Sequence, residues 1–235
     1  LALLNWLYGY FILPESLSAE NRRAFNWKRA NPVGSLLQLR RYPVIIGLIG
    51  SMLCLYIAGH SSQSTWSYYT MEKFGWNEKW VGYSLGFVGL TIGLVQGLLT
   101  RVIIPKLGAV RSVFVGLSLS AFGFVCFALA TQGWMMFALM IPFALGGIAG
   151  PSLQGIISGQ VPANEQGELQ GALTGLISAT SIVGPLLMTN LFSWFTTQNA
   201  PVYFPGAPFM MGAILTVLGM VLAIRPLRKF GAMGK

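Results

Sequence analysis

Long stretches without a charged residue constrain this chain more than any other feature of its sequence. Four such stretches cover residues 42–71, 80–100, 112–164 and 169–224. A helix needs about 20 apolar residues to cross about 30 Å of hydrocarbon, so the first two stretches hold one span each. The last two are long enough for two spans, and turn-forming residues near 131–133 and 196–201 divide them. The sequence therefore predicts an all-α, polytopic membrane protein with six complete transmembrane helices.

The expected bundle covers residues 42–225. Its six helices are predicted at about 43–71, 79–100, 112–131, 134–159, 169–195 and 208–224. Residues 1–13 are mostly apolar but too short for a span, so we interpret them as the end of a preceding helix. On this interpretation the chain is part of a longer protein and holds six helices plus the end of a seventh.

The composition agrees with a membrane location. Hydrophobic residues make up 54% of the chain and charged residues only 9%, whereas a soluble domain has about a quarter charged. Cys54 and Cys126 lie inside apolar stretches, where a free cysteine behaves as a small hydrophobic residue. The net charge of +9 fits cytoplasmic loops rich in Lys and Arg, so we expect no nucleic-acid partner.

The distribution of basic residues predicts the orientation. If the helices alternate in direction, all of the 15 Lys and Arg except Lys73 and Lys79 lie on one side of the membrane. Because such residues collect in cytoplasmic loops, the central loop 14–41 and the tail 226–235 are expected to be cytoplasmic. Residues 33–39 of the loop form either a short amphipathic helix or plain loop.

Glycine spacing and Gly-Pro pairs suggest how the helices pack and bend. Glycines repeat at about four-residue spacing at 82–97 and 167–175, which favours close helix packing or, alternatively, sliding between two conformations. Two pairs, Gly150-Pro151 and Gly184-Pro185, are expected to bend their helices.

Polar side chains inside the predicted spans are the candidates for function, because unpaired polar groups are costly in hydrocarbon. His60 and Gln63 lie on one helical face with Ser64, and Trp66 follows nearby. This face lines either a water-filled cavity or the outer interface, and His60 is a proton relay or a structural residue. Gln96 and Gln154 face either a substrate path or a neighbouring helix. The candidate cavity set is His60, Gln63, Trp66, Gln96 and Gln154.

Acidic residues are scarce. The chain has no Asp, and its six Glu fall in loops or at predicted helix ends. A membrane enzyme would place a nucleophile, a metal cluster or a carboxylate pair near a span, and we find none in the sequence. We therefore expect a transporter that needs no metal or cofactor. A non-transporting scaffold would not need His60, Gln63, Gln96 and Gln154 at membrane depth.

Five groups of residues, spread in order over nearly the whole chain, carry a family pattern. They are Leu13-Pro14-Glu15-Ser16-Leu17; Arg29-Ala30-Asn31-Pro32 with Gly34-Ser35-Leu36; Pro151-Ser152-Leu153-Gln154-Gly155 with Ser158; Gln166-Gly167 with Leu169-Gln170-Gly171; and Thr180-Ser181-Ile182-Val183-Gly184-Pro185-Leu186. Together they resemble the tetracycline-resistance and multidrug-efflux branch of the major facilitator superfamily.

The resemblance implies a twelve-helix transporter with two pseudosymmetric halves, of which this chain is the carboxyl-terminal one. It also implies exchange of a drug-like compound for protons across the bacterial inner membrane. The expected partners are that compound, protons, the lipid bilayer and an amino-terminal six-helix half. Transport of a metabolite by the same fold remains the alternative.

The chain departs from the family pattern at several positions. A gating motif of the type Gly-x-x-x-Asp-Arg-x-Gly-Arg is expected after helix 8; Lys106, Gly108 and Arg111 fit it, but Arg101 and Pro105 replace its Gly and Asp. Tetracycline carriers of this branch tend to have a His in helix 8 and an Asp in helix 9. The aligned residues here are Ile92 and Ser120, whereas Gln96 matches a family Gln. These departures speak against tetracycline as the substrate, and the proton-carrying carboxylate is expected in the amino-terminal half.

Overall fold

The structure is a computed structural model that describes residues 2–14, 43–198 and 200–233. The described secondary structure is helical throughout. Its elements are α1 (Ala2–Phe11), α3 (Pro43–Phe74), α4 (Glu78–Leu94), the π-helical turn η3 (Val95–Leu99), α5 (Thr100–Leu107), α6 (Ala109–Leu129), α7 (Gly133–Gly146), α8 (Ala149–Ser158), the 3-10 turn η4 (Ala163–Glu165), α9 (Gln166–Thr196) and α10 (Ala207–Met233). The predicted loop 14–41 lies outside the described residues, except for Pro14.

The predicted fold class is confirmed. Within the described part of the chain, six helical segments are long and apolar enough to cross a membrane. They are Ile45–Phe74, Glu78–Leu107, Ala109–Leu129, Gly133–Ser158, Ala163–Thr196 and Ala207–Gly231. Three of them combine several elements: α4, η3 and α5 form one, α7 and α8 form another, and η4 and α9 form the third.

Several helices continue past the uncharged stretches of the sequence. The second segment runs to Leu107 and so includes Arg101 and Lys106, and α10 continues beyond Ile224 to Met233. The basic side chains of these helix ends are exposed. Lys and Arg carry their charge on a long stem, so a helix can bear them where it leaves the hydrocarbon.

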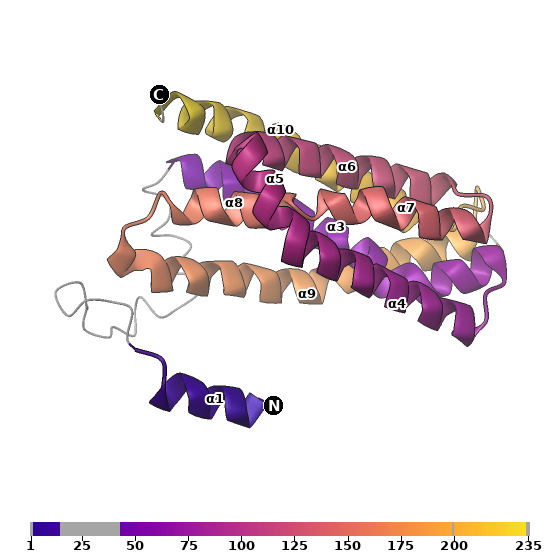
Figure 1. The fold of residues 1–235 in the computed structure, drawn as a ribbon. Helices are drawn as coiled ribbons and strands as arrows, with labels where there is room; N and C mark the ends of the chain where they lie inside the picture. The colour runs from indigo at the N-terminus through magenta and orange to yellow at the C-terminus, as the bar shows by residue number, and fades with distance from the viewer. Residues whose placement is uncertain (1, 15–42, 199, 234–235) are drawn as a thin grey trace.

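The helices pack around α3 and α6. The α3 helix packs against α10 and α9, while α6 packs against α10 and the α7–α8 segment (Figure 1). Where α6 crosses that segment, Gly116 approaches so closely that a Cβ atom there would lie 2.7 Å from the backbone nitrogen of Ala149. A larger residue at position 116 would therefore separate the two helices.

Two apolar cores support the bundle at its two ends. One includes Ile45, Leu117 and Leu227, and the other is an aromatic cluster around Phe127 and Phe209. These cores hold α3, α6 and α10 together along their length, because each of the three helices contributes side chains to both.

The α4 helix is packed much less than the others. Only 6% of the residues in the apolar stretch of its span are buried, compared with 33% to 50% in the other five spans. Apart from the backbone of their own helix, no described atom lies within 4 Å of a Cβ built on Gly82, Gly86, Gly89 or Gly93 of α4, or on Gly97 of η3. The glycine face of α4 therefore packs against nothing among the described residues.

Polar contacts join the helix ends at the side of the bundle where α3 and α6 end. Lys73 Nζ donates to the carbonyl oxygen of Ala128 at 3.0 Å and to Tyr69 Oη at 3.1 Å. In the loop before α10, the Tyr203 hydroxyl donates to Glu72 Oε1 at 2.8 Å. This hydrogen bond raises the pKa of Tyr203 above its ordinary value, because the bond and the nearby carboxylate favour the neutral phenol.

Candidate functional site

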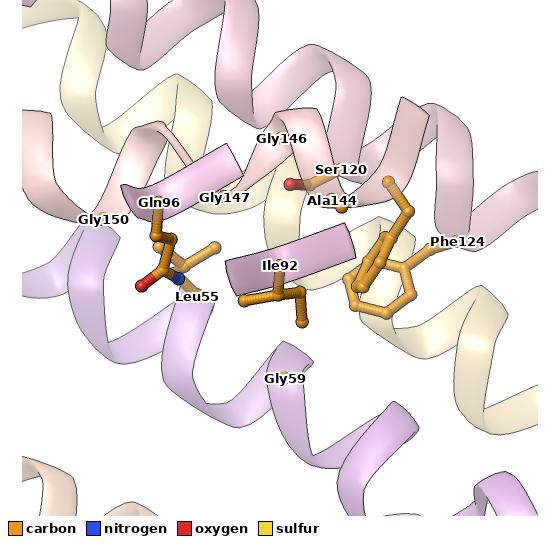
Figure 2. A pocket seen from close by; sticks show the side chains of 11 residues that line it. Leu55, Gly59, Ile92, Gln96, Ser120, Phe124, Ala144, Gly146, Gly147 and Gly150 are labelled. Atoms are coloured by element: carbon orange, nitrogen blue, oxygen red, sulfur yellow. The ribbon is translucent and has the colours of Figure 1, made fainter. Parts of the chain in front are cut away.

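Two adjoining hollows lie between α3, α4 and α7, at the middle of the bundle. Their volumes are about 200 Å³ and about 250 Å³. The first is lined by Leu55, Gly59, Ile92, Gln96, Ser120, Phe124, Phe143, Ala144, Gly146, Gly147 and Gly150 (Figure 2). The second is lined by Gly59, Ser62, Gln63, Trp66, Leu85, Val88, Ile92, Phe127, Met140 and Phe143. Because they share Gly59, Ile92 and Phe143, we treat them as one central groove.

A break between α7 and α8 shapes one wall of the central groove. The α7 helix ends at Gly146 and α8 begins at Ala149, so the interruption lies one turn before Pro151. Proline has no N–H to bond the carbonyl four residues earlier, which here belongs to Gly147. Gly146 and Gly147 line the groove, and the missing side chain of Gly146 also lets the segment pack closely against Ser120 of α6. The α9 helix continues through the other predicted bend, Gly184-Pro185.

Gln96 lies in a π-helical turn, η3, which the sequence did not predict. The hydroxyl of Thr100 donates to the carbonyl oxygen of Val95 at 2.9 Å, and the Thr100 backbone N–H bonds the same oxygen. Such turns insert extra width into a helix and often occur at functional sites. Figure 2 shows the side chains of Ile92 and Gln96 directed toward α3, where Leu55 and Gly59 lie.

The groove has an apolar body with amide groups along it. Gln63 and Gln96 are exposed in the groove and have no hydrogen-bond partner among the described residues. Each amide offers two donors and one acceptor oxygen to a bound molecule. Phe124 and Phe143 supply aromatic surface, with ring centroids 4.9 Å apart and ring planes inclined at 64° to each other. This lining suits a molecule with an uncharged, largely apolar body and a few hydrogen-bonding groups.

Trp66 forms part of the wall between α3 and α4. Its indole nitrogen donates to Ser84 Oγ at 2.9 Å, and its ring packs edge-on against Phe127 with centroids 5.4 Å apart. The side chain is buried apart from its groove surface. Trp66 therefore both lines the groove and holds the loosely packed α4 helix against α3.

The structure places the other two candidates outside the central groove. The His60 ring lies against Gly184 of α9, so closely that a Cβ atom at position 184 would overlap it. Gln154 is exposed on α8, where its Nε2 donates to Gln170 Oε1 of α9 at 3.4 Å. Gln63, Trp66 and Gln96 thus come together, and His60 and Gln154 do not join them.

The predicted gating residues surround the turn between α5 and α6. Gly108 has φ of +80°, a backbone conformation that side chains disfavour, so a glycine suits this turn. Lys106 lies in the last turn of α5 and Arg111 in the first turn of α6. Both side chains are exposed, and neither forms an ion pair within the described part of the chain. Nor do the described residues hold a group of three or more His, Cys, Asp or Glu that could bind a metal.

Comparison with known proteins places the chain in a family. No protein-family model matches it. It is 35% identical to the class C tetracycline resistance protein of Escherichia coli, over 87% of this chain and 52% of that protein. It is 30% identical to the class D protein of Salmonella ordonez, over 95% of this chain and 55% of the relative. It is 36% identical to the class B protein of Escherichia coli, over 72% of this chain and 42% of that protein.

The chain spans about half the length of the curated relatives it matches. The six apolar helices of the described residues indicate a multi-pass membrane protein. The alignments relate the chain to bacterial transporters and not to enzymes. Over that half, the chain is homologous to the tetracycline-resistance efflux proteins of the major facilitator superfamily.

Proposed function

We propose that the chain is the carboxyl-terminal half of a secondary transporter that exports an amphipathic, drug-like compound in exchange for protons. The central groove carries this proposal, because it offers the unpaired amides of Gln63 and Gln96 beside aromatic walls inside a membrane bundle. The homology to tetracycline-resistance proteins supports export of a drug as the direction and class of transport.

The lining of the groove supports a substrate class. Among the described residues, the lining of both hollows holds no Lys, Arg, Asp or Glu, which favours a substrate whose bound part is uncharged and contacts the aromatic rings and amides. Ile92 and Ser120 line the same hollow, at the positions where tetracycline carriers are expected to have a His and an Asp. We therefore propose a compound other than tetracycline, with Gln96 and Gln63 donating hydrogen bonds to its oxygen atoms.

Transport by alternating access requires helices at the groove to move. The α4 helix lines the groove with Leu85, Val88 and Ile92, and the break between α7 and α8 lines it from the other side, so a shift of either element changes the width of the groove. We propose that the groove faces an amino-terminal six-helix half, which completes the binding site. We propose that the same half holds the proton-carrying carboxylate, since the described Glu residues lie at helix ends or in a short turn. The basic loop ends and the carboxyl terminus are proposed to be cytoplasmic.

Transport by the full-length protein in everted membrane vesicles tests this function. We expect addition of at least one amphipathic drug to dissipate an imposed pH gradient. Gln96→Ala should weaken this response roughly three- to tenfold, because one hydrogen bond to the substrate is lost. Leu98→Ala is the matched control, because Leu98 lies in the same π-helical turn and lines neither hollow.

Two outcomes would count against the proposal. One is the absence of any drug-dependent proton flux over a broad panel of compounds. The other is net uptake of a metabolite by right-side-out vesicles, which would favour the metabolite-transport alternative.

A further inference from the structure

A third hollow lies between α5, α6 and the segment that joins α7 to α8, and we call it the outer groove. Its volume is about 330 Å³. It is lined by Ile103, Lys106, Leu107, Val115, Leu119, Leu145 and Ile148. None of these residues lines the central groove, so the outer groove is a separate site.

Positive charge gathers at one end of the outer groove. Lys106 is its charged lining residue and lies in the last turn of α5. Arg111 precedes Val115 by four residues on α6, so the two side chains lie on the same helical face. Lys106 and Arg111 are both exposed, and no described carboxylate pairs with either. The first N–H groups of α6, which begins between them at Ala109, add to the positive potential.

The rest of the outer groove is apolar and belongs to membrane-spanning segments. Val115 and Leu119 lie in the span Ala109–Leu129, and Ile103 lies near the end of the span Glu78–Leu107. The cations therefore mark the end of the hydrocarbon layer, and the apolar lining extends inward from it. A water-soluble anion would use the cations but leave this lining unoccupied.

We propose that the outer groove binds an acidic phospholipid. The phosphate group lies between Lys106 and Arg111, and one acyl chain occupies the apolar part of the groove. Clustered basic residues at a membrane surface attract acidic lipids, which supports the headgroup position. The lipid phosphate supplies the counter-charge that no described carboxylate supplies.

The bound acyl chain would also contact the back of the central groove. Leu145 and Ile148 line the outer groove, while Gly146 and Gly147 between them line the central groove. The same short break therefore separates the two sites. The lipid supports this break from the outside, whatever compound the central groove binds.

Native mass spectrometry of the detergent-purified, full-length protein tests the proposal. The probes are phosphatidylglycerol, phosphatidylcholine with the same acyl chains, and glycerol 1-phosphate, which lacks acyl chains. We expect one phosphatidylglycerol to be retained in preference to phosphatidylcholine, and no retention of glycerol 1-phosphate. The double variant Lys106→Gln/Arg111→Gln should bind phosphatidylglycerol roughly tenfold or more weakly, because both phosphate contacts are lost.

Two further variants separate this site from general attraction to a basic surface. Arg228→Gln/Lys229→Gln removes the same charge from exposed positions on α10 and should change the affinity by less than about twofold. Leu119→Trp fills the outer groove without changing its charge and should also abolish retention of phosphatidylglycerol. If the Leu119→Trp protein does not fold, Val115→Phe takes its place in the experiment. Equal weakening by the two charge variants, or retention that survives filling of the groove, would overturn the proposal.

Discussion

At the scale of single residues, the contact between His60 and Gly184 fixes how α3 meets α9. The imidazole ring occupies the space that a side chain at position 184 would need. Gly184 is buried and His60 is half-buried, so any side chain at position 184 would require the His60 ring to shift. The role of glycine here is steric, because it permits a close approach of two helices.

The contact between His60 and Gly184 predicts that adding one methyl group at position 184 destabilises the protein. Gly184→Ala should lower the free energy of unfolding by about 1–3 kcal/mol, because the added atom overlaps the ring of His60. Thermal unfolding of the purified protein measures the change.

Two further variants show whether the cost arises at this contact. His60→Ala should recover part of the loss in the double variant, because it removes the overlapping ring. Gly89→Ala is the control, since no described atom lies within 4 Å of its added Cβ, and it should change stability by less than about 1 kcal/mol. An equal cost for the two glycine variants would contradict the account.

The sequence predicted which polar residues lie at membrane depth, but not which way each one faces. Gln63, Trp66 and Gln96 were predicted as cavity residues and lie together in the central groove. His60 is three residues before Gln63, and such residues point about 60° apart around a helix. That difference is enough for His60 to meet α9 while Gln63 faces the groove. The positions of α4 and α9 decide this, and they depend on tertiary packing.

At the scale of elements, α4 stands out because few of its contacts hold it in place. The hydrogen bond from Trp66 to Ser84 is one of them, and both side chains are buried. Because the rest of α4 is largely exposed within the described bundle, the loss of this bond should affect α4 more than any other helix.

We therefore expect Ser84→Ala to destabilise α4 locally. The buried indole N–H of Trp66 loses its acceptor, which should cost about 1–3 kcal/mol of stability. Hydrogen exchange should accelerate along α4 and remain unchanged along α10. Thr91→Val is the matched control, because the Thr91 hydroxyl bonds only the carbonyl of Phe87 in its own helix, at 2.8 Å. Uniform acceleration in all helices would contradict a local role.

The sequence predicted the number of helices better than their internal detail. Uncharged stretches mark the hydrocarbon layer, which is why the six spans could be predicted. Pro151 was predicted to bend its helix, and the interruption lies at 147–148 because proline affects the carbonyl one turn earlier. The π-helical turn around Gln96 has no clear signal in sequence, since it depends on one inserted residue in the hydrogen-bond pattern.

At the scale of the whole molecule, two grooves lie on opposite sides of the break between α7 and α8. The central groove offers amides and aromatic rings, while the outer groove offers an apolar channel with cations at its end. The chain spans about half the length of the tetracycline-resistance proteins it matches, and we propose that further helices complete the central groove.

The accessibility of position 96 to a water-soluble reagent shows directly whether Gln96 lies in a substrate groove. The full-length protein is prepared with Cys54 and Cys126 replaced by Ser, and Gln96→Cys is then compared with Leu98→Cys as the control. A water-soluble thiol reagent should label position 96 in membranes, and a transported drug should slow that labelling. Position 98 should show no such protection. The absence of labelling at position 96 under both inward- and outward-facing conditions would contradict a substrate groove at this place.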